Sequence, residues 1–97
     1  MAVTIWKYSI SIYGESVLMV PEYSKVLSVQ NQFDKVCIWF LVDNAAPDEK
    51  RTFICFQTGV DLPWSIVNEK YIGTVQLSGG QYVIHVYEIR NKMKEIL

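Results

Sequence analysis

The chain has few of the side chains that carry metal or nucleophilic chemistry: among its 97 residues it has one histidine, His85, and two cysteines, Cys37 and Cys55. A structural zinc site needs four nitrogen or sulfur ligands, usually in two closely spaced pairs, so this set is incomplete. Both cysteines lie in apolar runs, where a thiol stays protonated, and we expect two buried free thiols. The sequence therefore indicates no metal, no cofactor and no enzyme.

Charge of either sign is not in excess, because nine Lys and Arg residues oppose ten Asp and Glu residues and the formal net charge is -1. Binding of extended nucleic acid needs a clustered basic face, which this sequence does not offer. No apolar run reaches the roughly 20 residues of a membrane-spanning helix, and the N-terminus has no signal-peptide pattern. We expect a cytoplasmic protein that does not enter membranes.

Hydrophobic residues are plentiful, at 51% of the chain, whereas charged residues make up 20%. A chain of this length forms one domain, here with residues 5–88 as its core and residues 89–97 as a tail that forms one or two helical turns. Small domains have much surface for their volume, so some apolar side chains must lie outside. A homo-oligomer or a ligand groove would cover them.

Alternation of apolar and polar residues predicts about seven short strands: 5–13, 17–20, 25–30, 36–43, 50–59 and the two arms of a hairpin within 71–88. This pattern is typical of a small all-β barrel or sandwich built from antiparallel hairpins. Residues 36–43 have no polar face and predict a central strand covered on both sides, with residues 50–59 paired beside it. Residues 59–68 are too apolar for a solvated tether and predict a lid over the core or a ligand.

The hairpin within residues 71–88 turns at Gly79 and Gly80, because glycine accepts the positive φ of a tight turn. This loop sets a register with one face that is nearly all apolar and should be core. Its pairs are Leu77 with Tyr82, Val75 with Ile84, Gly73 with Val86 and Tyr71 with Glu88. The other face mixes apolar and hydrogen-bonding side chains and is the best functional lead. Its pairs are Gln76 with Val83, Thr74 with His85 and Ile72 with Tyr87.

Further candidate binding residues lie outside this hairpin. Trp39 and Trp64 offer aromatic surface that can stack a base or a partner's side chain, although aromatic residues in small β domains usually belong to the core. Gln57 and Thr58, like Gln76, can donate or accept hydrogen bonds without a fixed charge. The full candidate set for binding a ligand or partner is Trp39, Gln57, Thr58, Trp64, Ile72, Thr74, Gln76, His85 and Tyr87.

Several strand segments carry a resemblance to a known group of sequences. They are IWKYSI at 5–10, KVLSVQ at 25–30, CIWFLVD at 37–43, KRTF at 50–53, TG at 58–59, YIGTVQ at 71–76, the following GG, and HVYE at 85–88. Together they resemble an uncharacterised family of small bacteriophage proteins. The resemblance implies a phage origin and a single small β domain, and it supplies no catalytic residues.

Three functions are compatible with these observations. The first is a non-enzymatic counter-defence protein that sequesters a small nucleotide-type signal at a subunit interface in the host cytoplasm. The second is an inhibitor that docks on a host protein through the face of Ile72, His85 and Tyr87. The third is a small virion or assembly protein. A sequestering protein should have a pocket with several inward polar groups, whereas a protein inhibitor should have a flat apolar patch.

Overall fold

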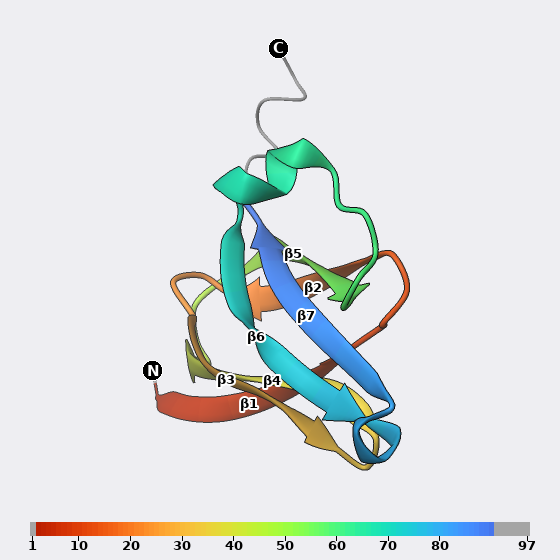
Figure 1. Cartoon of the computed structure of the whole chain (residues 1–97). Helices are drawn as coiled ribbons and strands as arrows, with labels where there is room; N and C mark the ends of the chain where they lie inside the picture. The colour runs from red at the N-terminus through yellow and green to blue at the C-terminus, as the bar shows by residue number, and fades with distance from the viewer. Residues whose placement is uncertain (1, 91–97) are drawn as a thin grey trace.

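Two antiparallel β-sheets pack face to face in the computed structural model, which describes residues 2–90 (Figure 1). One sheet has three strands in the order β1-β4-β3, and the other has four in the order β2-β5-β7-β6. The elements are β1 (Val3–Ile10), β2 (Glu15–Pro21), β3 (Lys25–Gln32), β4 (Lys35–Asp43), β5 (Asp48–Gln57), η1 (Trp64–Asn68), β6 (Lys70–Leu77), η2 (Ser78–Gly80) and β7 (Tyr82–Ile89), where η marks a 3-10 helix. The predicted all-β class is confirmed as a sandwich, and the sheets do not close into a barrel.

The central strand β4 supplies the middle of the core, as its apolar sequence predicts. It pairs with β1 along one edge and with β3 along the other. Its inward side chains are fully buried: Val36, Ile38, Phe40 and Val42. On its outward face Cys37 is buried, Trp39 is half-buried and Leu41 is exposed. Both faces of β4 are therefore covered only near Cys37.

Strand β5 does not pair with β4, and this part of the prediction is wrong. Both edges of β4 are occupied by β1 and β3, so the turn after β4 carries the chain to the opposite sheet, where β5 pairs with β2 and β7. Phe53 of β5 then faces Phe40 of β4 across the core, with ring centroids 6.0 Å apart. Alternation fixes which side chains point inward, but it does not determine which strands become neighbours.

The β6–β7 hairpin keeps the predicted register near its turn and departs from it at Ile72. Five of the predicted pairs are confirmed: Leu77 with Tyr82, Gln76 with Val83, Val75 with Ile84, Thr74 with His85 and Gly73 with Val86. A bulge between Tyr71 and Gly73 then shifts the ladder, so that Tyr71 pairs with Tyr87 and Lys70 with Glu88. The extra residue, Ile72, packs against the core. The predicted pairs Tyr71 with Glu88 and Ile72 with Tyr87 are therefore wrong.

The turn of this hairpin is wider than the two-residue loop expected from its glycines. Ser78, Gly79 and Gly80 all have positive φ, at 51°, 67° and 97°, and form the short η2. Asp34, in the turn between β3 and β4, holds this loop: Oδ1 accepts a hydrogen bond of 2.7 Å from the Ser78 amide. Nearby, Nδ2 of Asn31 donates to the Gln76 carbonyl at 2.8 Å. These bonds join the edges of β3 and β6.

The two cysteines are buried free thiols, as expected. Cys37 lies on the outward face of β4 and Cys55 on the inward face of β5, so they belong to different sheets. Burial raises the pKa of the Cys55 thiol to about 11. The predicted helical turns of the tail fall mainly on residues 91–97, which lie outside the described residues.

Candidate functional site

The outer face of the four-stranded sheet brings most of the predicted hairpin residues together. Strand pairing arranges side chains in rows across this sheet. Phe56, His85 and Thr74 form one row, and Ile54, Tyr87 and Tyr71 form the next. Thr58 follows β5 directly, and its amide donates to the Val83 carbonyl at 3.2 Å. We call Phe56, Thr58, Tyr71, Thr74, His85 and Tyr87 the outer patch.

A chain of hydrogen bonds runs through the outer patch. Nε2 of His85 is hydrogen bonded to Oγ1 of Thr58 at 2.6 Å, and Nδ1 is hydrogen bonded to Oγ1 of Thr74 at 3.0 Å. The Thr74 hydroxyl is also hydrogen bonded to the hydroxyl of Tyr71. Each hydroxyl can both donate and accept, and the imidazole has one nitrogen of each kind when neutral. This chain can therefore adapt to either a donor or an acceptor on a bound molecule.

Aromatic rings lie directly beside this polar chain. The Tyr87 ring packs edge to face against Phe56 and Tyr71, with centroid distances of 6.2 and 5.5 Å. Tyr71 is about half exposed, so the aromatic surface is open to solvent. Tyrosine is common at protein interfaces because its ring offers contact area and its hydroxyl offers a hydrogen bond. The outer patch combines both properties on one sheet face.

The remaining predicted site residues lie elsewhere. Gln76 is on the same face as the outer patch, one row beyond Thr74. Gln57 pairs with the inward-facing Ile84, and Ile72 packs against the core. Trp39 belongs to the other sheet, and Trp64 is in η1. Phe56 and Tyr71 are not among the binding residues predicted from the sequence. Tyr71 lies on this face only because of the bulge. Phe56 has no distinguishing signal in the sequence, because β5 carries apolar residues on both of its faces.

Residues 59–68 do not form a lid over the core, and the alternative of a lid over a ligand stays a prediction. In this segment only Ile66 is buried, whereas Trp64 is 84% exposed. Val60, Leu62 and Val67 are also exposed. The segment leads through η1 to the start of β6, at the end of the sheet where Tyr71 lies (Figure 1). It therefore adds exposed apolar surface rather than closing the core.

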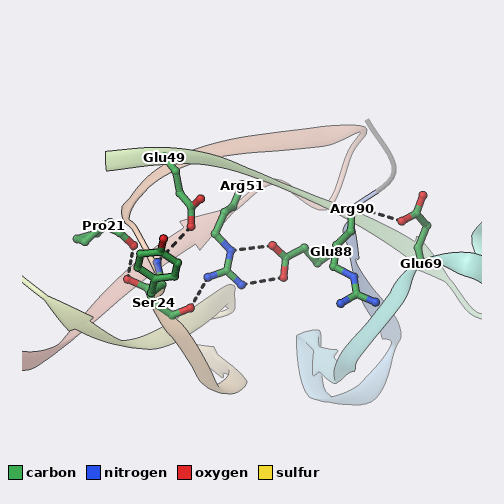
Figure 2. A network of polar contacts seen from close by, with 8 residues as sticks. Pro21, Ser24, Glu49, Arg51, Glu69, Glu88 and Arg90 are labelled. Carbon is green, nitrogen blue, oxygen red and sulfur yellow. Dashed lines mark hydrogen bonds and ion pairs between the residues drawn. The ribbon is translucent and has the colours of Figure 1, made fainter. Parts of the chain in front are cut away.

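A buried ion pair stands at the opposite, inward side of the same strands (Figure 2). Arg51 donates from Nε and Nη2 to the two carboxylate oxygens of Glu88 at 2.7 and 2.8 Å, and from Nη1 to the Ser24 carbonyl. Its guanidinium lies 5.2 Å from the centroid of the Phe40 ring. The side chains of Arg51 and Glu88 are only 15% and 7% exposed, and their hydrogen bonds raise the pKa of Arg51. This pair joins neighbouring strands of one sheet and neutralises both charges, and the Arg51 guanidinium reaches the other sheet through its contact with Phe40 of β4.

An open groove of about 620 Å³ lies beside this ion pair, where β7 ends. Its lining includes Lys50, Lys70 and Arg90, together with Glu49 and the Arg51–Glu88 pair. Because Arg51 and Glu88 neutralise each other, the other charged residues of the lining are three cations, Lys50, Lys70 and Arg90, and one anion, Glu49. Across residues 2–90 there is no group of three or more His, Cys, Asp and Glu side chains that could hold a metal ion. Nor does any helix there have the length and hydropathy to cross a membrane.

The fold and these surfaces define a small β-sandwich protein with an open polar and aromatic sheet face. The chain belongs to the family described as a domain of unknown function, DUF7352, whose model matches residues 1–96. No curated protein and no solved structure matches the chain significantly. The expected membership of an uncharacterised family is confirmed, and the phage origin stays a prediction.

Proposed function

We propose that the chain is a non-enzymatic binding protein that docks on another protein through the outer patch. The observation that supports this proposal is the junction of an open aromatic surface with the hydrogen-bond chain through His85. Protein interfaces favour exposed Tyr side chains whose hydroxyl groups find partners. The exposed apolar residues of 59–68, led by Trp64, extend the contact area at one end of the patch.

The biological setting that we propose comes from the resemblance to bacteriophage proteins. In that setting the partner is a host protein, the place of action is the host cytoplasm, and the role is counter-defence by inhibition. An inhibitor of this kind needs no catalytic residue. It needs an exposed surface that covers a functional site on the host protein, and the outer patch offers such a surface.

Capture from host lysate tests this function. We expect the wild-type chain to retain a host protein that Thr74→Arg does not retain, because the new side chain breaks the hydrogen-bond chain and obstructs the patch. Gln30→Arg is the matched control, since it places the same charge at an exposed strand position of the other sheet. Circular dichroism spectra like that of wild type would show that both variants are folded. If the lysate returns only the bait, docking on a host protein is wrong.

Sequestration of a nucleotide-type signal is the second candidate function. It is supported by the groove at the end of β7, where Lys50, Lys70 and Arg90 offer positive charge for phosphate groups. Calorimetric titration against cyclic nucleotides and ADP-ribose derivatives tests this candidate. Binding should weaken in Lys70→Glu and persist in Thr74→Arg. A broad panel in which no compound binds would remove the candidate.

A further inference from the structure

Strands at the edges of a sheet present unpaired N–H and C=O groups, and proteins usually cover or guard them. The sandwich has four such strands: β1, β2, β3 and β6. The edges of β3 and β6 are joined to each other by two hydrogen bonds. Asn31 donates to the Gln76 carbonyl, and Asp34 accepts from the Ser78 amide. Strand β2 begins at a charged residue, Glu15, and ends at Pro21, which has no N–H to donate. Three of the four edges are thus covered or guarded.

Strand β1 has no such guard. It pairs with β4 over eight residues in an unbroken register, with no bulge, proline or glycine, and no second strand pairs with it in the described part of the chain (Figure 1). Its single charged residue is Lys7, whose Nζ donates to the Gln32 side chain of β3. Because β3 lies on the far side of β4, the amine is drawn away from the free edge. A lysine at an edge usually prevents strand pairing, and here its charge is directed elsewhere.

Apolar side chains stand on both faces of this unguarded edge. Val3 and Ile5 lie on the outward face of the sheet, and Ile5 is 56% exposed. Trp6 lies on the inward face, where it is partly exposed at the side of the sandwich. A strand that added to this edge would cover backbone groups and these side chains together. Strand addition is an established route to specific association.

We propose that β1 pairs antiparallel with β1 of a second copy of this chain, so that two three-stranded sheets form one six-stranded sheet. Two features favour a second copy over another partner. Antiparallel pairing around a twofold axis gives each free donor of one strand an acceptor on its copy, and both strands offer the same apolar flanks. No like charges meet at the edge, since the Lys7 amine is held over the sheet face.

This dimer would leave the outer patch open on each copy, because the patch lies on the other sheet. One dimer would then present two docking surfaces. Two linked surfaces can bind a multivalent partner far more tightly than either surface alone. The proposed dimer therefore goes beyond the proposed function, and evidence against the dimer would leave that function unaffected.

Light scattering coupled to size-exclusion chromatography tests the interface in the full chain. We expect twice the chain mass of 11.2 kDa for wild type and for Val17→Lys, and a single chain mass for Ile5→Lys. Val17 is the matched control because it is also 56% exposed and lies on β2, an edge strand of the other sheet. A monomeric wild type, or a dimer that survives Ile5→Lys, would overturn the proposal.

Hydrogen exchange gives an independent test on wild type, which holds even if Ile5→Lys does not fold. Successive N–H groups of a strand point to alternate sides, so β1 has one set directed at β4 and one at the free edge. The proposal predicts slow exchange of both sets at high protein concentration. After dilution, exchange should become fast only for the N–H groups directed at the free edge. If that set exchanges quickly at every concentration, the edge is unpaired and the proposal is wrong.

Discussion

Removal of one partner from the Arg51–Glu88 ion pair should strongly destabilise the protein. The substitution Glu88→Gln leaves the Arg51 charge between the sheets without its carboxylate. Removing one partner of a buried pair costs about 3–5 kcal/mol. Because Arg51 keeps its bond to the Ser24 carbonyl and its contact with Phe40, we expect about 3 kcal/mol, near the lower end of this range. A domain of this size has a free energy of unfolding of only about 5–15 kcal/mol.

Urea denaturation followed by tryptophan fluorescence measures this loss. In thermal denaturation the same loss should lower Tm by roughly 12–24 °C, at about 4–8 °C for each kcal/mol. Lys50→Gln is the matched control, since it removes a charge from an exposed neighbour in β5 and should change stability by at most about 0.5 kcal/mol. The double variant Arg51→Met with Glu88→Leu should recover much of the loss, because apolar side chains of similar volume can replace a buried pair. A change below about 0.5 kcal/mol for Glu88→Gln would refute the reasoning.

Three further predictions concern single positions. A Cβ added at Gly73 would lie 2.5 Å from Cγ1 of Val29, so Gly73→Ala should lower the free energy of unfolding in urea by about 1–3 kcal/mol. Adding Val29→Ala should restore part of that loss, whereas additive losses would contradict the steric cause. Burial raises the pKa of Cys55 to about 11, so a thiol reagent at pH 8 should label it only on unfolding, and rapid labelling of the native protein would show that the thiol is accessible. The hydrogen bond from the Ser78 amide lowers the pKa of Asp34 in the folded protein. The Asp34 carboxylate therefore contributes stability at pH values above its unfolded pKa of 3.8, and this contribution is lost as the pH falls through the lower folded pKa. Asp34→Asn should flatten this part of the acid denaturation curve, and an unchanged slope would contradict the prediction.

The sequence predicts the elements of this fold better than their arrangement. Alternation gives the inward faces of the strands, and the glycines at 79 and 80 set five correct hairpin pairs. The bulge at Ile72 was not predicted, although it lies beside Gly73, and a glycine inside a strand often marks a bulge or a close approach of another chain segment. Here Gly73 has both, since a Cβ at this position would lie 2.5 Å from Cγ1 of Val29. The pairing of β5 is likewise a tertiary property, decided by the occupied edges of β4.

The candidate site is predictable from the sequence to a similar degree. The hairpin register alone predicts that Thr74 lies beside His85, and the folded chain adds Thr58 to the same series of hydrogen bonds. Arg51 was missed, although its partner carries a signal. The hairpin register assigns Glu88 to the apolar face, and a carboxylate on a core face needs a buried cation. Arg51, at an inward position of β5, is that cation.

The docking role of the outer patch is tested most directly by titration of a purified captured partner against wild type, Thr74→Arg and Gln30→Arg in a calorimeter. If the patch is the interface, Thr74→Arg should weaken binding at least about tenfold, equivalent to about 1.4 kcal/mol, while Gln30→Arg binds like wild type. Equal affinities for all three proteins would contradict the account and place the interface on another surface.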